Sequence, residues 1–319
     1  MNYQHAFHAG NFADVHKHVV LVRILEYLRQ KPAAFRVIDT HAGCGRYDLF
    51  GPEAERAQEW RDGIGRIFAG LPASTCKQQE VVRTGGAQML LAPYLDIVAA
   101  FNRNAKFRGG ELHDGNLGEG GFGGGNLRFY PGSPLIALAL MRPQDRLIAC
   151  ELELRAAASL KAALHTEPRA KMLAIDGWTA LNANVPPKER RGLVLVDPPY
   201  EDAGDFSRLS SAFAEAHRKW PTGIYLLWYP IKERDAADAL ARRLRKLTVP
   251  KILRCEMLRD APRADAGLIG SGLIVVNPPY TLQDELRVIL PVLGNLLREN
   301  ATYRLDWLAQ EAAHSTREG

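Results

Sequence analysis

The chain has 319 residues, of which 46% are apolar and 24% are charged, and 41 lysines and arginines against 36 aspartates and glutamates give a net charge of +5. These values exclude collagen-like, coiled-coil and wholly disordered proteins, and the length suffices for one large or two ordinary domains. The small positive charge favours an anionic partner, but it does not distinguish nucleic acids from small molecules.

Membrane and secretory signals are absent from the sequence. No stretch approaches the ~18 uncharged apolar residues of a membrane span, and the first residues lack the basic start and apolar run of a signal peptide. We therefore expect a cytoplasmic protein with no membrane partner. The four cysteines are widely spaced without a C-x-x-C pair, which argues against a disulfide framework and against a cysteine zinc site.

Helices and strands alternate along the chain. Apolar residues at helical spacing predict a helix over residues 13–30 with one face in the core. Helical segments separate most of the later strands, as in a parallel α/β sheet, and a last helix is predicted over residues 282–297. Seven short apolar runs predict the strands: residues 35–39, 146–150, 171–175, 192–196, 223–228, 252–257 and 272–276.

More than a hundred residues separate the first two predicted strands, far beyond an ordinary α/β connection. Helices are predicted inside this insertion over residues 54–68 and 87–101. Its end, residues 109–125, holds nine glycines in seventeen residues, a composition typical of a loop. We therefore predict a core of residues 1–50 and 127–319 and an inserted helical subdomain of residues 51–126.

Small and acidic residues follow the first three strands of the predicted sheet. Residues 39–45, DTHAGCG, include Gly43 in an incomplete G-x-G-x-x-G loop, over which a nucleotide-like cofactor could lie. Glu151 ends the second strand and could accept from both ribose hydroxyls, with Glu153 as the alternative. Asp176 could accept from an adenine amino group, and Gly177 would let the base approach. Together these positions predict an adenosine pocket.

The most specific motif is Asp197-Pro198-Pro199-Tyr200, directly after the fourth strand. The Asp197 carboxylate and the Pro198 carbonyl could accept both N–H bonds of an amino group and favour its attack as a nucleophile. Tyr200 offers an aromatic face to a base. A second string, residues 277–280 (NPPY), follows the seventh strand. Because that strand is expected to run antiparallel, its end points away from the cofactor, and Asn277 is expected to be structural.

Histidines crowd the first residues, where His5, His8, His16 and His18 accompany Asp14. A metal site is the alternative to weigh. Positions 16 and 18 are two apart on the predicted helix, so their side chains diverge by about 200°, unlike the i, i+4 pair of a zinc helix. We expect no metal, and we expect these side chains to make polar contacts to an anionic ligand or substrate.

Taken together, these residues resemble the bacterial 23S rRNA adenine-N6 methyltransferase family known as RlmJ. The N-terminal motifs are narrower in distribution than the Asp197 tetrapeptide, which several amino-methyltransferases share. The resemblance implies a class I methyltransferase fold, Rossmann-like, with a seven-stranded mostly parallel sheet and a helical insertion. The matching segments are residues 7–11, 13–15, 17–18, 39–43, 130–134, 176–177, 197–200, 223–225 and 227–230.

The resemblance also implies a cofactor, a substrate and residue roles. S-adenosylmethionine would be the methyl donor, and an adenosine in 23S rRNA would be the acceptor. Separately from the resemblance, we expect a monomer. Asp197 matches the family's catalytic acid, and Tyr3, His5 and Lys17 match residues placed near the target base. The cofactor-contacting positions are matched by His18, His41, Ser133, Glu151, Asp176 and Gly177.

Two alternatives remain at this point. The tetrapeptide also occurs in DNA-adenine and protein-glutamine methyltransferases, which act on different amino groups. Outside the enzymes, a methyltransferase fold without turnover could serve as a nucleic-acid-binding protein of DNA uptake or catabolism. Assays with DNA, protein and rRNA acceptors distinguish the first alternative from an rRNA methyltransferase. Failure to bind S-adenosylmethionine would support the second.

Overall fold

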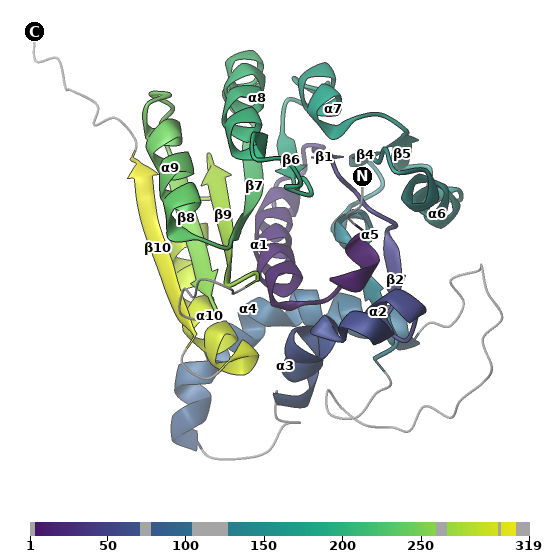
Figure 1. The fold of residues 1–319 in the computed structure, drawn as a ribbon, viewed down its shortest axis with the longest axis vertical. Helices are drawn as coiled ribbons and strands as arrows, with labels where there is room; N and C mark the ends of the chain where they lie inside the picture. The colour runs from purple at the N-terminus through teal and green to yellow at the C-terminus, as the bar shows by residue number, and fades with distance from the viewer. Residues whose placement is uncertain (1–3, 71–77, 104–126, 260–266, 299–300, 311–319) are drawn as a thin grey trace, which may run out of the picture.

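A computed structural model describes residues 4–70, 78–103, 127–259, 267–298 and 301–310 (Figure 1). Its centre is one eight-stranded sheet. In spatial order the strands are β10 (Thr302–Ala309), β8 (Ile252–Leu258), β9 (Gly270–Val276), β7 (Ile224–Ile231), β6 (Gly192–Val196), β1 (Arg36–Asp39), β4 (Arg146–Cys150) and β5 (Ala170–Leu173).

Most of the sheet is parallel. β1 pairs in parallel with β4 and β6, β4 with β5, and β6 with β7. β9 runs antiparallel to both β7 and β8, and β10 runs antiparallel to β8. The predicted fold class is therefore confirmed, and all seven predicted strands are present. Because β9 is antiparallel, its carboxyl end lies at the opposite edge of the sheet from the ends of β1, β4 and β6.

Three strands were not predicted from the sequence. β10 is the edge strand next to β8, and its exposed, partly charged residues lack an apolar run. β2 (Arg46–Asp48) and β3 (Phe129–Pro131) form a separate antiparallel pair. Each is only three residues long, and the two are far apart in sequence, so neither gives a recognisable signal.

The first helix, α1 (Phe12–Arg29), occupies the centre of the molecule (Figure 1). The Asn11 side chain caps it by accepting from the backbone N–H groups of Ala13 and Asp14, each at 2.9 Å. Fourteen of its eighteen residues are buried, so the prediction of a single core face was wrong. The helix is enclosed because β9, α4, α5 and α10 all pack around it.

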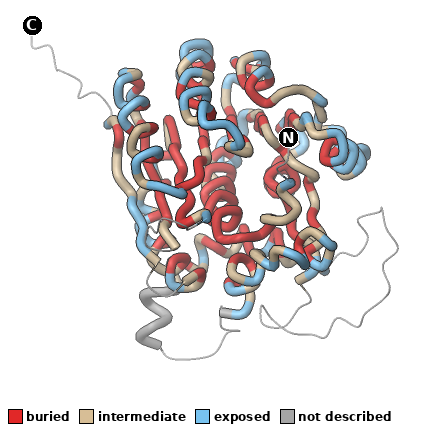
Figure 2. Tube along the Cα trace, in the orientation of Figure 1, coloured by how far each residue is buried: buried red, intermediate tan, exposed pale blue. Residues whose placement is uncertain are grey.

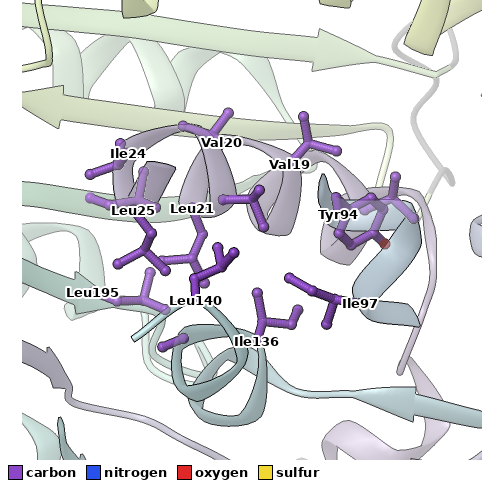
Figure 3. Packing of buried hydrophobic residues seen from close by; sticks show 14 of the residues in the cluster. Val19, Val20, Leu21, Ile24, Leu25, Tyr94, Ile97, Ile136, Leu140 and Leu195 are labelled. Carbon is purple, nitrogen blue, oxygen red and sulfur yellow. The ribbon is translucent and has the colours of Figure 1, made fainter. Parts of the chain in front are cut away.

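Helices cover both faces of the sheet. One hydrophobic cluster joins α1 to α4 (Gln78–Arg103), α5 (Ser133–Leu140) and α10 (Leu282–Leu297), and a second joins α7 (Gly177–Ala183), α8 (Asp205–Lys219) and α9 (Arg234–Arg245). Figure 2 shows the buried residues along the strands and α1. Figure 3 shows the packing of α1 against α4, α5 and β6, with Leu21, Leu25, Tyr94, Ile136 and Leu195 among the labelled side chains. Full burial of one such side chain contributes roughly 1.5–3 kcal/mol.

The region between β2 and β3 is helical, but its first helix is broken. Instead of one helix over residues 54–68, there are α2 (Pro52–Ala57), a 3-10 turn (Glu59–Asp62) and α3 (Ile64–Gly70). The break follows from a left-handed Gln58, with φ of 53°, and from Gly63, which lies against the backbone of Gly10. The second predicted helix is present within α4, and the glycine tract 109–125 lies outside the described residues.

These helices share the core of the sheet, because Leu91, Tyr94 and Val98 of α4 belong to the same cluster as α1. The division into a core and an inserted subdomain stays a prediction. Helix α6 (Leu154–Leu164) follows β4 and precedes β5. No helix in the described part of the chain is long and apolar enough to cross a membrane.

Gly63 gives a test of this arrangement. A Cβ there would lie 2.1 Å from the Gly10 carbonyl oxygen, whereas a Cβ on Gly85, inside α4, meets nothing within 4 Å. Gly63→Ala should therefore lower the free energy of unfolding by roughly 1–3 kcal/mol. Gly85→Ala should raise it by roughly 0.5–1 kcal/mol, because alanine favours a helix interior. Urea denaturation measures both, and equal effects in the two variants would contradict the close approach.

Candidate active site

Three neighbouring cavities lie at the carboxyl ends of β1, β4 and β6, and Pro199 lines all of them. Their volumes are about 230, 110 and 350 Å³. His41 and Glu151 line both the first and the second cavity. Lys17 and Asp197 line both the first and the third. The sequence-predicted residues that line these cavities are therefore brought together at one edge of the sheet, where the strand order reverses: β4 and β5 lie on one side of β1, and β6 and β7 on the other.

The loop after β1 is fixed by hydrogen bonds to its neighbours. The Thr40 hydroxyl donates to the Leu195 carbonyl at 3.0 Å, so His41 Nδ1 must donate to the same hydroxyl oxygen at 2.8 Å. Burial lowers the pKa of His41 to about 4. The imidazole is therefore neutral and carries its proton on Nδ1, which leaves Nε2 as an acceptor.

Glu151 closes the glycine loop over the first cavity. Its Oε2 accepts from the Gly43 N–H at 2.8 Å, and its Oε1 accepts from the Glu153 N–H at 2.8 Å. Gly43 has φ of +62°, and a Cβ there would lie 2.1 Å from the Tyr47 hydroxyl. Glu153 instead caps α6, because its carboxylate accepts from the N–H groups of Arg155 and Ala156 at 3.0 and 2.7 Å. Of the two carboxylates, Glu151 is the one tied to the loop.

Asp176 and Gly177 begin α7 beside the second cavity. Asp176 Oδ2 caps the helix by accepting from the backbone N–H and the hydroxyl of Thr179, at 2.9 and 3.0 Å. A Cβ on Gly177 would lie 2.4 Å from both His41 Nε2 and the Thr40 carbonyl oxygen. Packing against the β1 loop therefore requires a glycine here, whether or not a ligand approaches it.

Asp197 ends β6 and forms an ion pair with Lys17 of α1, from the Nζ to Oδ2. Lys17 Nζ also donates to Asp14 Oδ1 at 2.8 Å, and the Lys17 side chain is 4% exposed. Burial opposes the charged form, but the carboxylates of Asp14 and Asp197 outweigh it and raise the pKa of Lys17 above its ordinary value. The ammonium is therefore held between two carboxylates.

Asp14 connects this ion pair to the first residues of the chain. Besides Lys17, its Oδ2 accepts from His5 Nε2 and from the Gly10 N–H, both at 3.0 Å. Burial by itself raises the pKa of Asp14, yet His5 and Lys17 outweigh burial and hold the pKa well below its ordinary value. Asp14 was not predicted as a site residue, although its i, i+3 spacing from Lys17 on one helix is a usable signal.

His18 and Ser133 line the first cavity from the other side. His18 Nδ1 lies 2.7 Å from the Tyr130 hydroxyl, and burial lowers the pKa of His18 to about 3, so the ring is neutral. Its buried Nε2 has no hydrogen-bond partner among the described residues. Ser133 donates to Asp39 Oδ2 at 2.7 Å, and burial raises the pKa of Asp39 to about 7.

The histidines do not share one environment. His5 and His8 line the third cavity, where His8 Nδ1 lies 3.0 Å from Glu59. The expectation of a ligand contact was wrong for His16, which is fully buried against Ser271 and Cys255. Within the described ranges, no three His, Cys, Asp or Glu side chains could hold a metal ion.

Tyr200 and Asn277 both adopt positive φ, at 52° and 51°, but in different places. Tyr200 lines the third cavity, and its hydroxyl donates to the Trp228 carbonyl at 2.6 Å. Asn277 donates to the carbonyls of Pro221 and Gly223, each at 2.8 Å, and lines none of the three cavities. Tyr3 lies outside the described residues. Trp228 was not predicted as a site residue, although it lies in the buried strand β7.

Comparisons with known proteins match nearly the whole chain. A family model described as "Ribosomal RNA large subunit methyltransferase D, RlmJ" matches residues 32–113 and 122–309. Two relatives named ribosomal RNA large subunit methyltransferase J are similar over 98% of this chain and all of their own length. The one from Escherichia coli is 37% identical, and the one from Haemophilus influenzae is 34% identical.

A solved structure agrees with this. A crystal structure of a protein from Legionella pneumophila has a TM-score of 0.76 and 30% identity, covering 94% of this chain and 98% of that one. The similarity therefore extends from the sequence to the arrangement of the fold. On the strength of the family model and both relatives, the chain belongs to the RlmJ family of ribosomal RNA large subunit methyltransferases.

Proposed function

We propose that this protein transfers a methyl group from S-adenosylmethionine to the N6 amino group of an adenosine in 23S rRNA. The observation that carries the proposal is the position of Asp197, which lines both the first and the third cavity. A residue that holds an acceptor amino group against a methyl donor must reach both binding sites. The names of the relatives, which are ribosomal RNA methyltransferases, support the same reaction class.

The first and second cavities fit the cofactor. The buried Nε2 of His18 is available for a hydrogen bond from the first cavity, and the Glu151 carboxylate retains lone pairs for ribose hydroxyls. In the second cavity, Asp176 and Gly177 would flank the adenine, with the His41 imidazole beside them. When bound, S-adenosylmethionine supplies an electrophilic methyl group on a sulfonium sulfur.

The third cavity fits the target base. Asp197 and the Pro198 carbonyl would accept the two amino N–H bonds and direct the nitrogen lone pair toward the first cavity. Lys17 would hold the Asp197 carboxylate in place, with His5 and Tyr200 beside the base and Tyr3 near it. The bound cofactor would supply the methyl group for a new C–N bond in exchange for its S–C bond, and the methylated nitrogen would give one proton to water. Extrusion of the base from its stack costs a few kcal/mol.

We infer that the enzyme acts as a monomer. Its substrate would place it in the cytoplasm. The direct test is incubation with labelled S-adenosylmethionine and 23S rRNA from cells lacking the gene, followed by mass spectrometry of the nucleosides. N6-methyladenosine in the rRNA supports the proposal. Labelling of DNA or of a protein glutamine instead, or RNA binding without turnover, would overturn it.

The two tetrapeptides give a first prediction. Asp197→Asn replaces an acceptor oxygen by an N–H donor, so methylation of 23S rRNA should fall about a hundredfold or more while cofactor affinity changes far less. Asn277→Ala should lower stability by about 1–3 kcal/mol, because two carbonyls lose their donor, and should leave the turnover of folded protein intact. Single-turnover rates measure methylation in the two variants, calorimetry measures their cofactor affinity, and melting temperatures measure their stability. An inactive but folded Asn277→Ala protein beside an active Asp197→Asn protein would reverse the assignment.

A second prediction compares the two carboxylates after β4. Glu151→Ala should weaken the affinity for S-adenosylmethionine by tenfold or more, on the order of one charge-assisted hydrogen bond. Glu153→Ala should mainly cost about 1 kcal/mol of stability through loss of the α6 cap. Isothermal titration calorimetry and urea denaturation distinguish them. The reverse pattern, with affinity lost only in Glu153→Ala, would show that Glu153 and not Glu151 holds the cofactor.

Asp39 gives a pH prediction. Below pH 4 the carboxyl is protonated in both the folded and the unfolded chain, because its pKa is about 7 when folded and 3.8 ordinarily. Between these values only the unfolded chain releases the proton, so the parent loses stability as pH rises, by up to roughly 4 kcal/mol in all. Asp39→Asn removes this loss. Its stability relative to the parent should rise from pH 4 to 7 and then level off; a constant difference would contradict the raised pKa.

A further inference from the structure

Trp228 forms a wall of the third cavity. Its carbonyl accepts from the Tyr200 hydroxyl at 2.6 Å, and the two rings meet edge to face with centroids 5.7 Å apart. Both aromatic rings therefore stand beside the same space. An aromatic ring in this position offers a surface on which a base can stack.

The Trp228 indole is held from behind by a buried chain of hydrogen bonds. Its Nε1 donates to Ser271 Oγ at 3.0 Å, and the same Oγ lies 3.0 Å from His16 Nδ1. His16 Nε2 in turn lies 3.2 Å from Cys255 Sγ. These hydrogen bonds thus connect β7 through β9 to α1, and α1 to β8.

The direction of this chain is determined by its first donor. An indole N–H only donates, so the Ser271 oxygen accepts from Trp228. The described residues offer the Ser271 hydroxyl proton no acceptor besides His16 Nδ1, so that proton goes to His16. Burial lowers the pKa of His16 to about 3, so the ring is neutral and carries its proton on Nε2, facing Cys255. Ser271 Oγ thus accepts one hydrogen bond and donates one, and both ring nitrogens of His16 have a partner.

Ser271 and His16 do not line any of the three cavities, and both are fully buried. A buried hydroxyl and a buried imidazole cost free energy relative to apolar side chains unless they bond to something. Here the group that needs them is the indole N–H of Trp228. A phenylalanine at that position would need neither, so the polar chain is linked to keeping an indole in one orientation.

We propose that Ser271 and His16 are positioning residues that fix the Trp228 indole as a stacking wall for the target base. The inference rests on the proposed function and deepens it, since it names the residues that recognise the acceptor. A rotated indole would offer less stacking surface, so binding of rRNA would weaken while the cofactor site, on the other side of Asp197, stays intact.

The test compares two buried serines. Ser271→Ala removes the acceptor of the indole, whereas Ser210→Ala removes a buried hydroxyl that donates to the Ser207 carbonyl and lines none of the three cavities. We expect Ser271→Ala to raise the KM for 23S rRNA about tenfold, with the Kd for S-adenosylmethionine unchanged. Ser210→Ala should stay within about twofold of the parent in both. Equal KM values in the two variants would overturn the proposal.

A double-mutant cycle shows whether Ser271 acts through the indole. Trp228→Phe keeps a ring but removes the N–H, and should by itself raise the KM for rRNA. Adding Ser271→Ala to Trp228→Phe should then change the KM by less than twofold; a further tenfold rise would overturn the proposal. If Ser271→Ala does not fold, an unchanged KM for rRNA in Trp228→Phe would also overturn the proposal. A parent chain inactive on 23S rRNA would instead defeat the proposed function.

Discussion

The ion pair between Lys17 and Asp197 is the interaction on which the rest of the site depends. It joins residues 180 positions apart, from a central helix and from the end of a central strand, in surroundings where Lys17 is almost fully enclosed. A buried ammonium that loses its partner costs about 3–5 kcal/mol. The helix must therefore lie where Lys17 reaches Asp197, and Asp14 completes the neutralisation from the same helix. The position of the N-terminal segment relative to β6 follows from this constraint.

The burial of α1 on nearly all sides explains why its polar residues have separate roles. At 3.6 residues per turn, positions 14, 17 and 18 share one side of a helix, whereas position 16 lies about 200° from position 14. Accordingly, Asp14, Lys17 and His18 face the cavities, and His16 faces the sheet, where Ser271 receives it. One helix thus supplies an ion pair to the site on one side and a hydrogen bond to its supporting strand on the other. The two contacts together fix the rotation of the helix.

Much of the sheet and the position of the site could be predicted, because each inner strand is a short apolar run and the ends of neighbouring parallel strands meet at one edge. Glu151, Asp176 and Asp197 were found in this way. Contacts distant in sequence were not predictable. β10 is a strand through its antiparallel pairing with β8, across which Arg254 pairs with Asp306 at 2.7 Å. The helix expected over residues 54–68 is broken where Gly63 meets Gly10. His16 appeared to be a ligand contact because no local pattern reveals which side of a fully enclosed helix faces a cavity.

The origin of the cavity walls separates methyl donation from choice of acceptor. Loops after β1, β4 and β5 line the first two cavities, so the proposed donor site would use the common edge of the sheet. The third cavity is lined instead by the N-terminal segment, the start of α1 and the end of β7. His5, Lys17, Asp197 and Pro199 line both the first and the third cavity. In the proposed function, the tetrapeptide would account for attack by an amino group and not for which amino group is chosen; that choice would depend on residues such as His5 and Trp228, which line the third cavity.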